Sequence, residues 1–505
     1  MPGPSQMILL AVGFSVAAST ASCPDYSAYS KQMHEPRSNG SYRLSAMRPE
    51  RACRTFHSSV VEQTIAAVQA DMADPDLSRL FANAFPNTLD TAIRWHGVAA
   101  DNAAEELTFV ITGDIDAMWL RDSANQLQSY RSLLKADTNN SSNSSLASLY
   151  RGVINLQARY LLQAPFCNSF QPPAESALAP AVNDAAADDS VTPSYSTDHV
   201  FECKFELDSL AAFLQLSADY FAATDDAAFF ARFRWLDAVQ AVLHTAVAMQ
   251  TPTYAANGSV LASPYTFRRQ TTRATETLAN DGRGSPVAAG TGLIRSAFRP
   301  SDDSTLLQLF IPANMIGLAD DMHRLAADVR AAIARFGLVD NPNQNGSSVY
   351  AYEVDGFGSA VLMDDANIPS LLASPFFGFT TVDDPLYQNT RAAILNQNAR
   401  PGNPYFMQGP VISAVGGPHD GPGMAWPMAS IVRILTSDDD DEIAAQLKML
   451  VSSTDGLGLI HESINSFNQS DWTRQWFSWV NGLFGQMILD LRERKPALLK
   501  LSYQP

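Results

Sequence analysis

Residues 476–491 read WFSWVNGLFGQMILDL. The apolar residues of this stretch recur at steps of three and four, which is the spacing of one face of an α-helix. The same spacing returns at residues 60–72, 207–221 and 322–336. The period-two alternation of half-buried strands is scarce along the chain. Repeated amphipathic helices over this length predict an all-α protein whose helices form a toroid.

The composition is that of a large globular protein. Of the 505 residues, 46% are hydrophobic and 17% are charged, so a sizeable core can form. Length alone allows two or three domains, but a helical barrel can use this length as one unit, and we predict a single domain over residues 23–505. The formal net charge of −18 argues against a nucleic-acid partner and fits a neutral substrate. No feature of the sequence indicates an oligomeric state.

The first residues have the pattern of a signal peptide. An apolar run from Met7 to Ala18 is followed by small residues, as in the core and cleavage site of a secretory signal. No lysine or arginine precedes the run, which departs from the usual pattern. The run is too short to span a bilayer, and no later segment is long and apolar enough. We therefore expect removal of residues 1–22, secretion, and no insertion into a membrane.

Glycosylation signals and irregular segments agree with an extracellular protein. Flexible inserts are predicted near residues 137–145, which are rich in Asn and Ser, and near residues 171–194, which are rich in Ala, Pro and Asp. Sequons of the Asn-X-Ser/Thr type accept glycans when they are exposed in a secretory compartment. They occur at Asn39, Asn139, Asn140, Asn143, Asn257, Asn345 and Asn468.

Four cysteines allow three disulfide connectivities in an oxidising compartment. We predict the pairs that are nearest in sequence, Cys23–Cys53 and Cys167–Cys203. The alternative is that some of these cysteines stay free and buried. No CxxC motif or cluster of His and Cys suggests a zinc site.

The first polar motif is TGDIDAMWLRDS, residues 112–123. Asp114, Asp116 and Asp122 surround Trp119 and Arg121. A carboxylate can accept hydrogen bonds from two neighbouring hydroxyls, and a Trp face can stack on the apolar side of a sugar ring, so the motif suits a neutral carbohydrate. The alternatives are a buried Arg–Asp pair that holds a turn, and a calcium site built from the aspartates.

The second motif is FRPSDDSTLLQLFIPANM, residues 298–315. Its adjacent carboxylates, Asp302 and Asp303, repel each other in a site of low dielectric constant, so that one keeps its proton. A protonated carboxyl group is what a general acid requires. An ordinary helix cap would explain one of the two residues.

Three further motifs complete the polar set. Residues 352–367 contain YEVDGFG and DDAN, and residues 416–426 read GGPHDGPGMAW, a glycine-rich loop that lacks the ending of a phosphate-binding loop. Residues 458–479 contain HESIN in an aromatic region. Glu462, which lies there between a His and an Asn, is interpreted as a carboxylate of a sugar site.

Taken in this order, the motifs resemble those of glycoside hydrolase family 125, the exo-α-1,6-mannosidases, from about residue 58 to residue 491. The resemblance implies an (α/α)6 barrel whose site lies among the loops that connect the helices. It also implies hydrolysis of non-reducing terminal α-1,6-linked mannose from an oligosaccharide or glycan, with inversion and with neither a metal nor another cofactor. The two inserts depart from the family pattern and put its outer substrate subsites in doubt.

Roles carried over from the family make Glu462 the general base and one of Asp302 and Asp303 the general acid. We favour Asp302, with Asp303 binding sugar hydroxyls. Inversion by this pair requires the two carboxyl groups to lie ~6.5–9.5 Å apart, to leave room for water. The predicted substrate-binding residues are Asp114, Asp116, Trp119, Arg121 and Asp122, with Asp355, His419 and His461 as weaker candidates.

Two alternatives remain at this point. One is a different helical-barrel glycosidase, of the glucoamylase kind, that acts on another sugar or linkage. The other is a carbohydrate-binding protein without turnover. The presence of both candidate carboxylates argues against the second alternative, because a binding protein does not need a base opposite an acid.

Overall fold

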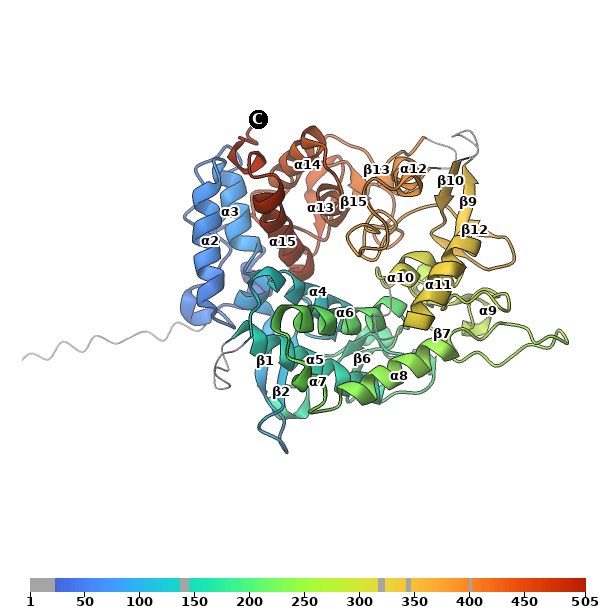
Figure 1. Ribbon diagram of the computed structural model, residues 1–505. Helices are drawn as coiled ribbons and strands as arrows, with labels where there is room; N and C mark the ends of the chain where they lie inside the picture. The colour runs from blue at the N-terminus through green and yellow to red at the C-terminus, as the bar shows by residue number, and fades with distance from the viewer. Residues whose placement is uncertain (1–22, 137–144, 317–322, 342–346, 399–401) are drawn as a thin grey trace, which may run out of the picture.

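The computed structural model describes residues 23–136, 145–316, 323–341, 347–398 and 402–505 (Figure 1). The predicted signal peptide, nearly all of the first insert and four sequons (Asn139, Asn140, Asn143 and Asn345) lie outside these ranges. Asn39, Asn257 and Asn468 are described and exposed, as glycan acceptors must be. None of the helices in the described ranges has the length and apolar character needed to cross a membrane.

Helices supply most of the regular structure, as the spacing of apolar residues predicted. In chain order they are α1 (Tyr26–Tyr29), α2 (Ser59–Asp71), α3 (Pro75–Ala84), α4 (Leu120–Gln128), α5 (Leu146–Gln163), α6 (Leu207–Thr224), α7 (Ala227–Phe230), α8 (Trp235–Ala248), α9 (Ala279–Gly282), α10 (Ile311–Met315), α11 (His323–Phe336), α12 (Pro385–Ile394), α13 (Pro427–Leu435), α14 (Asp440–Ser452) and α15 (Ser478–Arg494).

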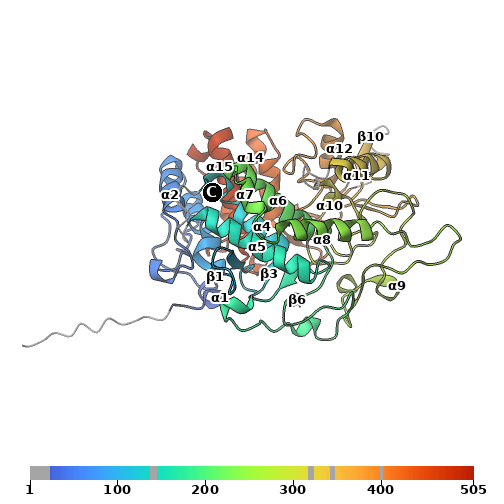
Figure 2. The ribbon, with the colours of Figure 1, turned by 60° about the horizontal axis from the view of Figure 1, so that its bottom comes forward.

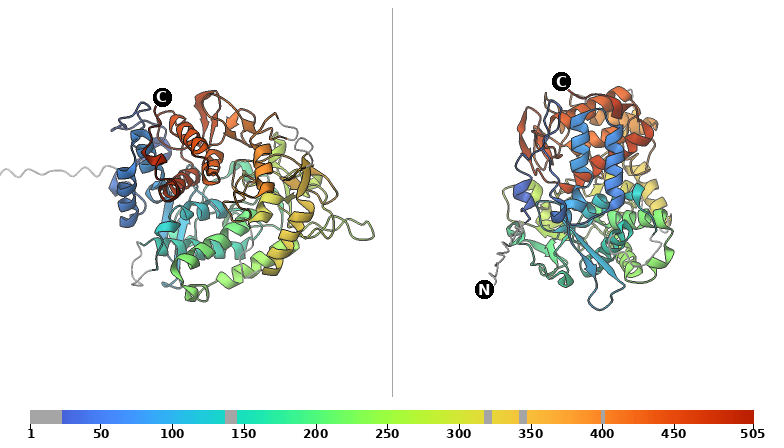
Figure 3. Two further views of the ribbon diagram at one scale, coloured as in Figure 1. Left: turned by 45° about the horizontal axis from the view of Figure 1, so that its top comes forward. Right: turned by 90° about the vertical axis from the view of Figure 1, so that its left-hand side faces the viewer.

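An inner set of helices is covered by an outer set. In the inner set, α4 packs against α6 and α15, α6 against α10, and α15 against α13. The outer helices α5, α11, α14 and α3 pack on α6, α10, α13 and α15 in turn. Figure 2 shows α5 and α8 in front of α6. The chain runs round the molecule and returns, so that its last long helix contacts the early helix α3 (Figure 3).

Burial differs between the outer helix α11 and the inner helix α15. In α11 the buried side chains are confined to one stripe that includes Val329 and Ile333, as expected of an outer helix. Every residue of α15 from Ser478 to Gly485 is buried, because neighbouring helices surround it. A Cβ atom at Gly485 would lie 2.5 Å from the ring of Phe85, so this position needs glycine for close helix packing.

Short strands are the main departure from the all-α prediction. Most have only two to four residues, too few to produce a visible alternation. They are β1 (Ile93–Val98), β2 (Glu106–Val110), β3 (Met118–Trp119), β4 (Ser169–Phe170), β5 (Ser190–Thr192), β6 (Val200–Glu202), β7 (Thr266–Arg268), β8 (Leu309–Phe310), β9 (Leu338–Asn341), β10 (Ser347–Tyr350), β11 (Glu353–Val354), β12 (Ala360–Val361), β13 (Phe406–Met407), β14 (Ala414–Val415), β15 (Met424–Ala425), β16 (Ser463–Asn465) and β17 (Asn468–Thr473).

These strands form antiparallel sheets that lead into the inner helices. In the sheet β3–β4–β6, strands β3 and β6 directly precede α4 and α6. In the sheet β12–β11–β8, strand β8 directly precedes α10. In the sheet β15–β16–β17, strands β15 and β17 precede α13 and α15. In the last of these sheets Ser463 is the partner of Thr473, which brings Glu462 beside Arg474. The sheets therefore bring residues from distant parts of the sequence to one end of the inner helices.

Both predicted disulfides are present, Cys23–Cys53 and Cys167–Cys203. The second joins the segments that carry β4 and β6. The segment 171–194, predicted to be a flexible insert, is irregular for most of its length but is attached to the rest of the molecule. Its strand β5 pairs with β7, and Asp189 forms a buried ion pair with Arg269.

Candidate active site

A cavity of about 590 Å³ lies at the end of the inner helices where the polar motifs meet. Its volume is in the range of small-ligand sites. The lining comes from all five sequence motifs together with residues from the segments 181–183 and 201–204. It comprises Thr112, Asp114, Ile115, Asp116, Trp119, Arg121, Asp122, Ala181, Val182, Asn183, Phe201, Glu202, Lys204, Pro300, Ser301, Asp302, Asn367, His419, Trp426, Glu462, Arg474, Phe477 and Trp479.

Residues at the N-terminal ends of three inner helices line this cavity. Arg121 and Asp122 open α4, Trp426 precedes α13, and Phe477 and Trp479 stand at the start of α15. The N-terminal end of a helix carries a partial positive charge that stabilises nearby carboxylates. This arrangement explains in part how so many acidic side chains gather in one buried place.

The two adjacent aspartates of the second motif separate at a tight loop. Asp302 has φ of 64°, in the left-handed region that few residues other than glycine adopt. The loop is closed by hydrogen bonds from the Arg299 N–H to the Asp303 carbonyl (2.8 Å) and from the Asp302 N–H to the Arg299 carbonyl (2.9 Å). Asp302 lines the cavity, whereas Asp303 is buried behind it against His419.

The third motif supports this loop from behind. Glu353 accepts a hydrogen bond from Arg299 (2.7 Å) in a fully buried ion pair, and it also accepts the N–H groups of Leu306 and Leu307 (2.9 Å each). The Ser301 hydroxyl donates to Asp365 at 2.9 Å. The buried Arg299–Glu353 pair and the bonds that Glu353 accepts from the backbone fix the loop on which Asp302 depends.

Two side chains from other parts of the chain contact the Asp302 carboxylate. Its Oδ1 accepts hydrogen bonds from Trp119 Nε1 (3.4 Å) and from Asn168 Nδ2 (3.2 Å). Asn168 follows Cys167, so the disulfide to Cys203 helps to set its position. The carboxylate is therefore held in one orientation toward the cavity.

The pKa of Asp302 is governed by its charged neighbours. Burial alone would raise this pKa. The positive charges of Lys204 and Arg121, together with a hydrogen bond from Glu206, outweigh burial and lower the pKa of Asp302 to about 2. Burial raises the pKa of Glu206 well above its ordinary value, and the charge of Asp302 raises it further. The pKa values of the two groups are therefore shifted in opposite directions.

Arg121 is the centre of the acidic group at the floor of the cavity. Its guanidinium contacts Glu206 (2.5 Å), Asp208 (3.2 Å) and Asp122 (3.0 Å). Its charged group also lies 5.5 Å from the ring centre of Trp479. The buried Arg–Asp pair considered as an alternative for the first motif is therefore present, and the same arginine lines the cavity.

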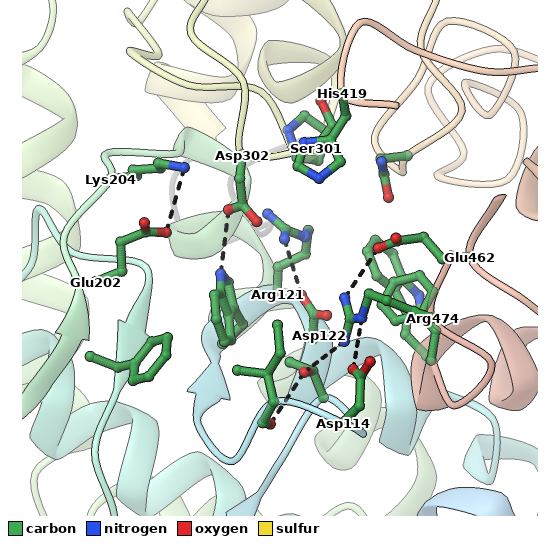
Figure 4. Close-up of a pocket in the computed structure, with 18 of the residues that line it drawn as sticks. Asp114, Arg121, Asp122, Glu202, Lys204, Ser301, Asp302, His419, Glu462 and Arg474 are labelled. Atoms are coloured by element: carbon green, nitrogen blue, oxygen red, sulfur yellow. Dashed lines mark hydrogen bonds and ion pairs between the residues drawn. The ribbon is translucent and has the colours of Figure 1, made fainter. Parts of the chain in front are cut away.

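Glu462 lies on the opposite side of the pocket from Asp302 (Figure 4). Its Oε1 accepts a hydrogen bond from Arg474 Nη1 at 3.1 Å, and Arg474 Nε donates to Asp114 at 2.8 Å. Burial raises the pKa of Glu462, while the charges of Arg474 and His419 act to lower it. Arg474 thus positions both a candidate base and a predicted sugar-binding carboxylate.

Removing the charge of Arg474 is expected to shift the pH dependence of activity. In Arg474→Met the pKa of Glu462 rises further, and a base with a higher pKa becomes protonated at a higher pH. The acid limb of kcat/KM should therefore move upward by about one to three pH units, as expected for loss of a neighbouring opposite charge. The profile is measured with an activated aryl mannoside.

Two variants serve as controls for this experiment. Arg474→Lys keeps the charge but not the paired contacts to Glu462 and Asp114, and should shift the acid limb less. Arg492→Met removes an arginine from an exposed pair with Asp71 (2.8 Å), away from the cavity, and should leave the profile unchanged. An unchanged acid limb in Arg474→Met would contradict the assignment of Glu462 as the base.

His419 reaches the cavity from the glycine-rich motif. Its Nδ1 lies 3.5 Å from Asp303 Oδ2. Burial acts to lower the pKa of His419, but Asp303, Glu462 and Asp420 together raise it to about 10. The imidazole is therefore a cation at neutral pH, and it lies between the two sides of the site.

The remaining predicted site residues have different positions. Asp116 lines the cavity at its rim, where it forms a half-exposed ion pair with Arg94 at 3.2 Å. Asp355 and His461 are not among the residues that line the cavity in the described part of the chain. Asp355 accepts the N–H groups of its own turn, and His461 is stacked on Trp472. Both contacts are structural.

Several donors that line the cavity are unpaired. Within the described ranges, Trp426 Nε1, Trp479 Nε1 and Asn367 Nδ2 are buried and have no hydrogen-bond partner in the protein. Buried donors are nearly always satisfied, and an unpaired one costs about 1–3 kcal/mol. Three such donors beside several carboxylates match a ligand that carries many hydroxyl groups.

The aspartates of the first motif are already paired with arginines. Asp114 contacts Arg474, Asp116 contacts Arg94, and Asp122 contacts Arg121. No group of three or more His, Cys, Asp or Glu residues in the described ranges is arranged to hold a metal ion. The calcium alternative for this motif therefore has no support in the geometry.

Sequence analysis missed the segment FECKFELD, residues 201–208. It supplies Glu202, Lys204, Glu206 and Asp208 to the site or its floor. Its alternating charged and apolar residues flank Cys203, and a charged residue next to a disulfide cysteine was the available signal. The carboxylates of this segment matter only because the fold brings them to Arg121 and Asp302.

Comparison with known proteins agrees with this geometry. Residues 74–489 match the family model described as metal-independent alpha-mannosidase (GH125). The chain is 49% identical over 497 residues to the meiotically up-regulated gene 157 protein of Schizosaccharomyces pombe, with 95% of this chain and 94% of that protein covered.

Among solved structures, a metal-independent alpha mannosidase of Streptococcus pneumoniae aligns with a TM-score of 0.72 and 32% identity, over 87% of this chain and 99% of the other. That protein was solved in a non-productive complex with α-1,6-mannobiose. A putative glucoamylase from Bacteroides caccae aligns with a TM-score of 0.36 and 11% identity, over 87% of this chain and 94% of the other. This second likeness is too distant to support a conclusion.

The matched region contains every residue that lines the cavity. A helical fold with carboxylates, aromatic rings and unpaired donors at one end of its inner helices defines the class as a glycoside hydrolase. The chain belongs to the metal-independent α-mannosidases, glycoside hydrolase family 125. The resemblance found from the sequence motifs is therefore confirmed.

Proposed function

We propose that this protein is a secreted, inverting exo-α-mannosidase that removes non-reducing terminal α-1,6-linked mannose from oligosaccharides or glycans. The observation that carries the proposal is the position of Asp302 and Glu462 on opposite sides of one cavity (Figure 4). A carboxyl group on each side of the scissile bond is the arrangement used by most glycosidases. The bound α-1,6-mannobiose of the pneumococcal relative supports the linkage.

The proposed reaction is a single displacement. Glu462 takes a proton from water as the water oxygen bonds to the anomeric carbon. Asp302 donates a proton to the glycosidic oxygen as the bond from that oxygen to the anomeric carbon breaks. The products are β-mannose and the shortened glycan. The proton that Asp302 gives up is replaced from the medium, and Glu462 returns its proton to the medium.

Asp302 must carry a proton when it acts, although its own pKa is low in the free protein. Glu206 is the neighbour that can supply this proton, because burial and the charge of Asp302 raise its pKa well above the ordinary value. We propose that Glu206 holds a proton in the free protein, and that this proton passes to Asp302 and then to the leaving oxygen. Arg121 and Lys204 stabilise the two carboxylates that remain.

The predicted binding roles follow the same geometry. Asp114, Trp119 and Asp122 line the cavity and are proposed to contact the terminal mannose, with Asp116 at the rim and Arg121 beneath. The ring of inner and outer helices supports the predicted (α/α)6 barrel. Two disulfides and three exposed sequons support secretion.

Hydrolysis of α-1,6-, α-1,2- and α-1,3-mannobiose, followed by NMR of the anomer released first, tests this function. We expect cleavage of the α-1,6 linkage in preference to the others, and β-mannose as the first product. Release of α-mannose would contradict inversion. Preference for an α-glucoside would favour a glucoamylase-like enzyme, and binding without hydrolysis would favour a carbohydrate-binding protein.

A further inference from the structure

Residues 181–183 form part of the cavity lining, although they belong to the segment that departs from the family pattern. Val182 is 83% exposed at the edge of this polar pocket. Phe201, which is partly buried, lines the same side. An exposed apolar side chain beside a partly buried aromatic ring gives this side of the cavity an apolar surface that a ligand can cover.

Residues 181–183 and Phe201, here called the wall of the cavity, are held in place by hydrogen bonds and ion pairs at several points. The Gln171 side chain bonds both the N–H and the carbonyl of Ala181 (2.9 Å each). Asn183 Nδ2 donates to the Phe201 carbonyl at 3.0 Å. At the far end of the segment, Asp189 is paired with Arg269, which also contacts the end of β6. These hydrogen bonds and ion pairs therefore fix the segment as a part of the cavity lining.

The wall lies on the side of the candidate acid. Trp119 donates a hydrogen bond to Asp302 (3.4 Å) and packs edge-on against Phe201, with 5.5 Å between ring centres. Figure 4 places Glu202 and Lys204, which follow Phe201 in the chain, beyond Asp302 and away from Glu462. In an inverting enzyme the leaving group lies on the acid's side of the scissile bond, and water lies on the base's side.

We propose that residues 181–183 and Phe201 form a subsite for the leaving sugar, the neutral pyranose ring to which the terminal mannose is attached. Val182 and Phe201 contact the apolar C–H face of this ring. Glu202 and Lys204, deeper on the same side, bond its hydroxyls. This inference rests on the proposed function, since it requires Asp302 to be the acid.

A pair of substrates separates the subsite from the chemistry. α-1,6-Mannobiose places a sugar in the leaving position, whereas α-mannosyl fluoride leaves only fluoride and places nothing there. In Val182→Gly, kcat/KM for mannobiose should fall about threefold to tenfold, the effect of losing one apolar contact. kcat/KM for the fluoride should stay within about twofold of its original value.

Two further variants complete the test. Phe201→Leu keeps an apolar side chain but removes the ring, and should show the same selective loss. Val260→Gly removes an equally apolar side chain, 61% exposed, on a different loop, and should change neither substrate.

The subsite would be overturned if Val182→Gly and Phe201→Leu left kcat/KM unchanged for both substrates. It would also be overturned if kcat/KM fell by the same factor for both substrates. If the unaltered protein cleaves neither substrate, the proposed function fails, and the subsite fails with it. Cleavage of both substrates by the unaltered protein without a selective effect in the variants would overturn the subsite alone.

Discussion

Asp302→Asn is expected to lose most of its activity on α-1,6-mannobiose and to keep much of it on an activated aryl mannoside. Asparagine cannot give a proton to the leaving oxygen. A sugar alkoxide is a poor leaving group and needs that proton, whereas a nitrophenolate does not. A positioned acid contributes ~10²–10⁴-fold, and a loss of that size is expected in kcat/KM for mannobiose alone.

The adjacent residue provides a matched control. Asp303 is buried against His419 and does not line the cavity in the described part of the chain, so Asp303→Asn should not show this dependence on the leaving group. If Asp303→Asn shows the dependence and Asp302→Asn only weakens binding, the acid is Asp303 and the mechanism stands. Steady-state kinetics with both substrates distinguish the two cases.

Glu462→Gln should damage both substrates alike. Water must be deprotonated whichever group leaves, and glutamine cannot accept the proton. We expect ~10²–10⁴-fold lower kcat/KM on mannobiose and on the aryl mannoside. Mannose binding, measured by calorimetry, should survive, because Arg474 still contacts Asp114 when the base is neutral.

Glu442→Gln is the control for this second variant. Glu442 is also a partly buried glutamate that contacts arginines, Arg391 (2.6 Å) and Arg433 (2.8 Å), but it lies in the outer helix α14. Its substitution should leave kcat/KM unchanged for both substrates. The catalytic assignment as a whole would be abandoned if no substitution at Asp302, Asp303 or Glu462 lowered turnover by even about 10-fold.

Sequence patterns predicted the long helices well and the strands poorly. The stripe of α11 and the dense apolar run of α15 are local properties, and both appear as helices. Strands such as β3 and β8 have two residues each, so no period can reveal them. The apolar pattern also did not separate inner from outer helices, because burial around α15 depends on neighbours from distant parts of the chain.

In the candidate site, too, local sequence patterns predicted some residues and missed those whose role depends on distant neighbours. TGDIDAMWLRDS, FRPSDD and HESIN indicated carboxylates for sugar chemistry because their composition alone carries that signal. Asp355 and His461 were included for the same reason, and the structure gives them local contacts outside the cavity. Glu206 and Lys204 were omitted, since a lone charged residue near a cysteine is ambiguous until its neighbours are known.

The sequence by itself determined the family and the residue types that the chemistry requires, because these follow from motifs. It favoured the disulfide pairs nearest in sequence, and the structure decided among the possible connectivities. Only the tertiary structure distinguished Asp302 from Asp303, because one tight loop with a left-handed residue turns the first toward the cavity and the second away. It alone joined Arg474 to Asp114, which are 360 residues apart. Charges shift one another's pKa through space, so proximity that the sequence does not encode locally sets the protonation of this site.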